Sequence, residues 1–152
     1  MLQQRPNDTP GINTAMQRFL RYLIALVLLS AGGAKLFDLP GFVAVLLSYR
    51  FFPYQLTWPV AVTVVAVELL LALWLIWGYS PLRAAQGSIA MHSIYAGWAI
   101  YMLSSSRPIL NCGCFGSLLA RPLSWMTVVE DLVMVSLSVA LYRLCLGGRQ
   151  TG

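Results

Sequence analysis

The sequence predicts an all-α polytopic membrane protein, a four-helix bundle with a short interfacial helix between its first and second spans. Of its 152 residues, 59% are apolar and only 10% are charged, and the mean hydropathy is +0.72. This composition excludes an ordinary soluble domain, because so much apolar surface must face lipid. The charges leave four stretches long enough to cross about 30 Å of hydrocarbon at about 1.5 Å per residue.

The predicted spans cover residues 17–37, 58–78, 82–103 and 124–146. Together they define one transmembrane domain over 14–147. The polar segment 1–13 is expected to be a disordered cytoplasmic lead-in, and 148–152 a cytoplasmic tail.

An alternative interpretation of the first span is a cleaved secretory signal. Arg18 and Arg21 would form its basic region, and the small residues at 30–34 its cleavage site. The apolar run continues beyond these small residues through Leu36 and Phe37. We therefore expect a retained first helix.

The segment between the first two spans begins with Lys35 and Asp38, which are predicted to form an ion pair at the helix end. After Pro40 and Gly41, the apolar segment 42–52 is too short to span and predicts an interfacial or re-entrant helix. Its aromatic neighbours are typical of the headgroup level: Tyr49, Phe51, Phe52, Tyr54 and Trp58. The short connection 79–81 predicts an antiparallel hairpin of the second and third spans.

Lys and Arg residues near the span ends predict the orientation, because positive side chains resist translocation. One side carries Arg5, Arg18, Arg21, Arg83, Arg143 and Arg149. The other carries Lys35, Arg50, Arg107 and Arg121. This bias places both termini in the cytoplasm and the loop 104–123 on the outer, oxidising side. The net charge of +5 follows from this membrane role, and we expect no nucleic-acid partner.

Cys112 and Cys114, in the loop before the fourth span, are the main candidates for chemistry. The intervening glycine lets the two sulfurs meet in a strained, reducible ring, and an accessible pair of this kind is what thiol–disulfide exchange requires. Two alternatives remain open: a static disulfide or unremarkable thiols, and capture of Cu(I) by two thiolates. Cys145 lies about 30 Å away at helical rise and cannot join them. The loop residues that keep the site unencumbered are Asn111, Gly113 and Gly116.

Glu68 is a carboxylate near the centre of an apolar span, where a charge is costly unless it has a function or a partner. His92 is expected at a similar depth in the next span, so the two side chains can meet across the hairpin. Such a contact could relay protons or hold a quinone oxygen. The alternative is an interhelical hydrogen bond that serves packing. The sequence contains no zinc-type paired cysteine motif, and we predict neither a metal site nor a haem.

Glu130 and Asp131 fall about two turns into the fourth span, on the same side as the cysteines. One interpretation is proton management for the thiols. The other, which we favour, is a hydrated or Arg-paired helix end, with Arg107 or Arg121 as partner.

Several of these residues together resemble the MauE and DoxX-like membrane proteins, from about Arg18 to the end of the chain. The residues that carry the resemblance are Gly33, Lys35, Leu36, Phe37, Asp38, Phe42, Glu68, Gly78, Cys112, Gly113, Cys114, Phe115 and Gly116. The resemblance implies a bacterial inner-membrane four-helix bundle. Its MauE branch implies methylamine utilisation and disulfide formation with a thioredoxin-like periplasmic partner. The DoxX branch implies a quinone-linked oxidoreductase subunit, generally without the Cys-Gly-Cys motif. Glu130 and Asp131 depart from the Arg and Asn that relatives often place there.

The cysteine motif favours the MauE branch. The predicted function is thiol–disulfide exchange between a membrane component and a thioredoxin-like partner, with Cys112 and Cys114 as the redox pair. Asn111, Gly113, Phe115 and Gly116 would support the loop, and a quinone near Glu68 and His92 is a possible electron acceptor. The alternative functions are a non-enzymatic assembly or Cu(I)-handling protein, and a DoxX-like quinone-linked subunit.

Overall fold

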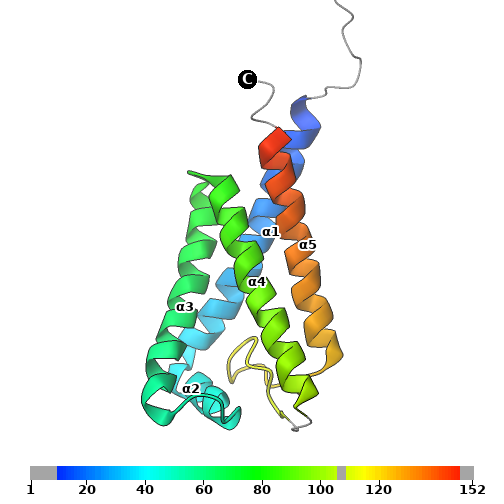
Figure 1. The fold of residues 1–152 in the computed structure, drawn as a ribbon. Coiled ribbons are helices and arrows are strands. Elements are labelled where there is room, and N and C mark those ends of the chain that lie inside the picture. Colours follow the sequence, from blue (N-terminus) through cyan, green and yellow to red (C-terminus); the bar gives the residue numbers. More distant parts are fainter. Residues whose placement is uncertain (1–9, 106–108, 148–152) are drawn as a thin grey trace, which may run out of the picture.

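The computed structural model describes residues 10–105 and 109–147, and this part of the chain is all-α. Residues 1–9, 148–152 and Arg107, which entered the expectations above, lie outside the described residues. Within the described part there are five helices and no strand: α1 Pro10–Phe37, α2 Leu39–Ser48, α3 Tyr54–Trp77, α4 Pro81–Ser104 and α5 Trp125–Gly147 (Figure 1).

The four long helices run along a common direction, and α2 lies across one end of them (Figure 1). The most extensive packing joins α4 to α5 and α1 to α3, while α2 packs mainly on α3. The loop 109–124 shares the α2 end of the bundle, whereas the start of α1 and the end of α5 lie at the opposite end (Figure 1). The short helix α2 and the cysteine loop therefore lie together at one end of the bundle.

The short helix exists, but it begins earlier than the sequence pattern predicted. It covers Leu39–Ser48 rather than 42–52, because Pro40 sits in its first turn, where a missing N–H costs nothing. Asp38 is the N-cap and accepts a hydrogen bond from the Gly41 backbone N–H at 3.0 Å. A proline interpreted as a helix breaker is thus part of a helix start.

Two buried apolar clusters hold the bundle together. The first cluster lies toward the end of the bundle with the start of α1 and the end of α5. It joins α1, α3, α4 and α5, and its side chains Ile24, Leu28, Leu75 and Leu141 are almost completely buried. At the other end, the side chains of α2 pack against α3 and α4, beneath the loop that carries the cysteines. The second cluster therefore forms the floor of the candidate site.

Large apolar side chains also cover the outside of the helices, including Phe19, Leu26, Leu70 and Ile94. Among the described helices, two are long and apolar enough to cross a membrane, Thr14–Phe37 with mean hydropathy 1.6 and Tyr54–Trp77 with 2.4. The helices α4 and α5 are similarly long, at 24 and 23 residues. Their polar residues, such as His92, lower their hydropathy.

Candidate functional site

The cysteine loop is tied into a compact turn by backbone and side-chain hydrogen bonds. Its two sides are joined by a hydrogen bond from the Cys112 N–H to the Arg121 carbonyl, at 2.8 Å. The Asn111 side chain accepts from the Gly113 N–H at 2.9 Å and donates to the Gly116 carbonyl at 3.1 Å. Asn111 therefore clamps the Cys-Gly-Cys turn from within.

Both glycines of this turn occupy backbone conformations that favour glycine. Gly113 has φ of 70° and Gly116 has φ of 64°, in the left-handed region that side chains disfavour. A Cβ on Gly113 would also lie 2.9 Å from the Tyr49 hydroxyl, and one on Gly116 would lie 3.2 Å from Lys35 Cα. The loop can approach α1 and α2 this closely because both positions lack a side chain.

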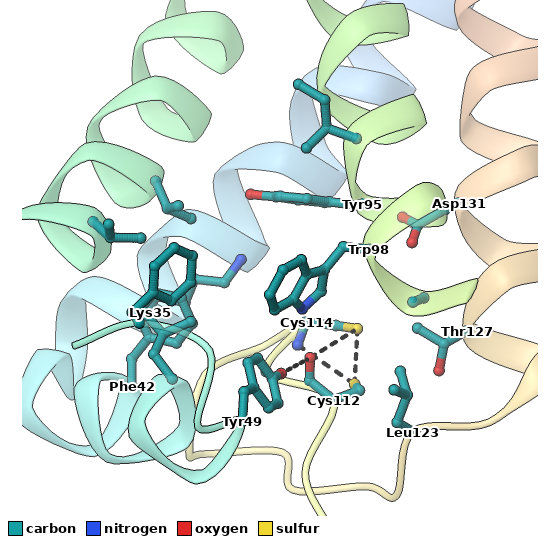
Figure 2. A pocket seen from close by; sticks show the side chains of 17 residues that line it. Lys35, Phe42, Tyr49, Tyr95, Trp98, Cys112, Cys114, Leu123, Thr127 and Asp131 are labelled. Carbon is teal, nitrogen blue, oxygen red and sulfur yellow. Dashed lines mark hydrogen bonds between the residues drawn. The ribbon is translucent and has the colours of Figure 1, made fainter. Parts of the chain in front are cut away.

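The two cysteine sulfurs face each other inside the loop. Cys112 Sγ and Cys114 Sγ lie 2.7 Å apart and share a hydrogen bond (Figure 2). A disulfide requires about 2.05 Å between the sulfurs, so the pair needs only a small approach when a disulfide partner oxidises it. The Tyr49 hydroxyl donates to the Cys112 carbonyl at 2.6 Å and anchors the pair to α2 (Figure 2).

The charges around the pair favour a single thiolate. The hydrogen bond shared with Cys114 and, to a smaller extent, the guanidinium of Arg121 together lower the pKa of Cys112 to about 6. Conversely, the adjacent Cys112 sulfur and burial raise the pKa of Cys114. Cys112 is therefore the better nucleophile, because the thiolate is the attacking species.

Arg121 was not among the residues expected to touch the cysteines. It forms a two-pronged ion pair with Glu130, with one N–H donating to Oε1 at 2.7 Å. This confirms the predicted Arg pairing for Glu130, but Asp131 has no such pair in the described part of the chain. The same guanidinium also favours the thiolate form of both cysteines, since it lowers the pKa of each thiol. Neither hydropathy nor spacing marks such a contact, because Arg121 lies seven residues beyond Cys114.

The predicted ion pair of Lys35 with Asp38 is wrong. Lys35 Nζ lies 2.5 Å from Glu68 Oε1, and both side chains are buried, at 2% and 1% exposed. Asp38 instead caps α2 and accepts a hydrogen bond from Ser117 of the cysteine loop. The lysine side chain enters the bundle, whereas the aspartate lies past the helix end, where one of its oxygens satisfies the free N–H of Gly41.

The expected contact between Glu68 and His92 is also not formed. Glu68 Oε1 accepts from Tyr95 Oη at 2.7 Å, in addition to its pairing with Lys35. His92 Nδ1 lies 2.9 Å from the Ser88 carbonyl, one turn back on the same helix. Each group has found a different partner. Glu68 and His92 nevertheless line the same cavity.

Two cavities lie next to the cysteines, the first bordered by Cys112 and Cys114 and the second by Cys114. The first, about 190 Å³, lies among α2, α3, α4 and the loop, and both sulfurs lie at its wall (Figure 2). The second, about 460 Å³, lies between α1 and α5 and is bordered by Glu68 and His92. Four residues border both cavities: Tyr95, Cys114, Thr127 and Asp131.

Cys145 is remote from this site, as its place in the sequence predicted. It is buried in the last turn of α5, at the end opposite the loop, and its sulfur accepts from Gln17 Nε2 at 3.0 Å. In the described part of the chain, no cluster of three or more His, Cys, Asp or Glu residues could hold a metal ion.

Comparison with known proteins gives the chain its family. The model of the family described as methylamine utilisation protein MauE matches residues 13–144. The chain belongs to the MauE family. It is 29% identical over 122 residues to the methylamine utilization protein MauE of Paracoccus denitrificans. This match covers 80% of the chain and 66% of the relative, slightly less than two thirds of its length. No solved structure matches the chain. MauE membership and the apolar helices together indicate a membrane protein.

Proposed function

We propose that this MauE-family chain is the membrane component of a thiol–disulfide exchange system, with Cys112 and Cys114 as its redox pair. The observation that carries the proposal is the pair of sulfurs 2.7 Å apart in a glycine-bent loop. Arg121 beside them favours the thiolate. The partner would be a thioredoxin-like periplasmic protein, and the exchange would support maturation of another periplasmic protein.

The chemistry follows from the unequal sulfurs. The Cys112 thiolate attacks a sulfur of the partner's disulfide, which breaks and leaves a mixed disulfide and a partner thiolate. The Cys114 thiolate then attacks Cys112, which forms the Cys112–Cys114 disulfide and releases the partner as a dithiol. Two electrons pass from the chain to the partner, and the two thiol protons end on the partner. The same steps in reverse pass the disulfide from the chain to the partner and leave the chain as a dithiol.

The proposal includes four transmembrane helices, α1, α3, α4 and α5, in the bacterial inner membrane. The alignment of these four helices along a common direction supports this proposal, as does the apolar exterior of the bundle (Figure 1). The loop lies at one end of the bundle, and the start of α1 and the end of α5 lie at the other (Figure 1). The distribution of Lys and Arg then favours cytoplasmic termini and a periplasmic cysteine loop.

In the reverse sequence, which leaves the chain as a dithiol, a membrane quinone is proposed as the acceptor that takes the two electrons from the chain on the lipid side. The cavity between α1 and α5 holds Cys114 at one part of its wall and Glu68, His92 and Tyr95 at another. Within the described residues, Glu68 Oε2 is buried without a hydrogen-bond partner, so it is available to a ligand hydroxyl. A bound quinone supplies a two-electron, two-proton acceptor. The test is consumption of an added short-chain quinone by the reduced chain in vesicles, and no consumption would contradict this part.

The first experiment is thiol alkylation of the chain in intact membranes, with and without mild reductant. In a Cys145→Ser background, a mass shift that appears after reduction shows an oxidised, reducible pair. Cys114→Ser is then expected to accumulate a mixed disulfide between Cys112 and the partner.

The alternative functions give other results in the same experiments. Thiols that stay reduced, and that copper protects from alkylation, would indicate Cu(I) handling. Full activity of the Cys112→Ser, Cys114→Ser double variant in cells would indicate a docking or assembly role.

A further inference from the structure

Asp131 of α5 is the acidic group at the point where the two cavities meet. It borders both of them, as does Cys114. Figure 2 shows its carboxyl group on the same side of the first cavity as the two sulfurs. In the described part of the chain, no hydrogen bond or ion pair engages this carboxyl group. It is therefore free to accept a proton.

The neighbouring acid, Glu130, is occupied differently. Both of its oxygens accept hydrogen bonds from Arg121. A carboxylate held in such a pair is a poor proton acceptor, because protonation would break the pair. Of these two adjacent carboxylates on α5, Glu130 is therefore paired with Arg121, and Asp131 is available as a proton acceptor.

The other charged and titratable groups near Asp131 already have partners or lack basicity. Glu68 is paired with Lys35 and Tyr95, and the Tyr49 hydroxyl is bonded to the Cys112 carbonyl. The groups that face this region from the surrounding elements are Lys35 of α1, Tyr49 after α2, Glu68 of α3, His92 and Tyr95 of α4, Arg121 of the loop and Glu130 of α5.

The exchange reaction needs a proton acceptor at this place. Cys114 must attack as a thiolate, but burial and the neighbouring sulfur raise its pKa. A base beside the sulfur removes this obstacle when it takes the proton as the new bond forms.

We propose that Asp131 is the general base for Cys114, an inference that rests on the proposed thiol–disulfide exchange. As Cys114 attacks the mixed disulfide at Cys112, its proton passes to the Asp131 carboxylate. The bond between Cys112 and the partner breaks, the Cys112–Cys114 bond forms, and the departing thiolate takes the proton back from Asp131.

The test uses the purified full chain with Cys145→Ser and dithiobis(nitrobenzoate) as a small disulfide. Its first chromophore release reports attack by Cys112, and the second reports ring closure by Cys114. We expect Asp131→Asn to slow the second release by about tenfold or more, with the first release changed by less than about threefold.

A second measurement separates a base from a structural residue. In a Cys112→Ser background, the alkylation rate of Cys114 reports its thiolate fraction. Asp131→Asn removes a nearby negative charge that raises the Cys114 pKa, so alkylation is expected to shift to lower pH. Slower closure together with easier alkylation identifies a lost base.

Glu130→Gln is the charge-matched control. It also removes a negative charge next to the site and releases Arg121, but it leaves Asp131 in place, so closure is expected to slow much less than in Asp131→Asn. Unchanged closure in Asp131→Asn would overturn the inference, and so would a parallel fall of closure and alkylation. Failure to exchange with any protein partner, with closure still dependent on Asp131, would instead contradict the proposed function alone.

Discussion

The cysteine loop and the buried lysine cluster are two polar sites of one bundle, and they are built in opposite ways. In the loop, residues close in sequence hold the sulfurs, since Asn111 bonds to the backbone on both sides of Cys114. The backbone of Cys112 is anchored to the Tyr49 hydroxyl. The loop therefore keeps its shape without help from the thiols themselves.

The lysine cluster depends on side chains from three helices. Lys35 of α1 and Tyr95 of α4 both bond to Glu68 of α3. Removing one partner leaves a buried charge unpaired, which is far more costly than the loss of the interaction itself. The comparison indicates that the thiol chemistry and the buried charges that stabilise the bundle reside in different places.

The largest effect expected is the loss of exchange on removal of the sulfurs. Cys112→Ser together with Cys114→Ser should abolish mixed disulfides with a partner, yet change the free energy of unfolding by less than about 1 kcal/mol. The reason is that the anchoring bonds involve backbone atoms. Partner trapping and detergent-mediated unfolding measure the two quantities. A strongly destabilised double variant would break the contrast.

The reverse result is expected in the cluster. Glu68→Gln should lower the free energy of unfolding by about 3–5 kcal/mol, because Lys35 is left buried without a counter-charge. The matched control is Lys35→Met with Glu68→Leu, in which both charges are gone and most of the stability should return. Unfolding in denaturing detergent compares all three chains. A loss below about 1 kcal/mol in the single variant would show that Lys35 reaches water.

A glycine substitution tests how rigidly the loop is held. Gly113→Ala places a side chain at φ of 70° and 2.9 Å from the Tyr49 hydroxyl, at a cost of about 1–2 kcal/mol. It should also weaken disulfide closure. Gly97→Ala is the control, because a Cβ there meets nothing within 4 Å and should stabilise α4 by about 0.5–1 kcal/mol. Equal effects of the two changes would contradict a strained loop.

The smallest effect expected concerns the pH dependence of the thiols. The lowered pKa of Cys112, about 6, means that its alkylation should rise with pH through about that value. Arg121→Gln removes a positive charge that favours the thiolate, so the midpoint should move to higher pH by about one unit. A pH series with a neutral alkylating reagent measures this. A midpoint that stays or falls would show that Arg121 serves only Glu130.

The sequence patterns predicted the helices well, because apolar runs and helix-breaking residues act locally. The predicted spans fall within or nearly coincide with α1, α3, α4 and α5, and a short helix was predicted after the first of them. Its start was misplaced, because Pro40 can either end one helix or begin the next. Local rules do not distinguish these roles unless the cap is known.

The contacts of the polar side chains could not be predicted in the same way. Lys35 and Asp38 are close in sequence, but Lys35 found its partner 33 residues away. Glu68 and His92 were placed at the same depth, but their directions around the helices were unknown. His92 bonded within its own helix to Ser88.

By itself, the sequence determined the all-α class, the apolar helices and the Cys-Gly-Cys pair, because these depend on composition and on residues within a few positions of each other. Only the tertiary structure decided which charges face one another: Lys35 with Glu68, Arg121 with the sulfurs, and Asp131 beside Cys114. The physical reason is that buried charges must find a partner wherever packing brings one, and packing depends on how whole helices turn and cross.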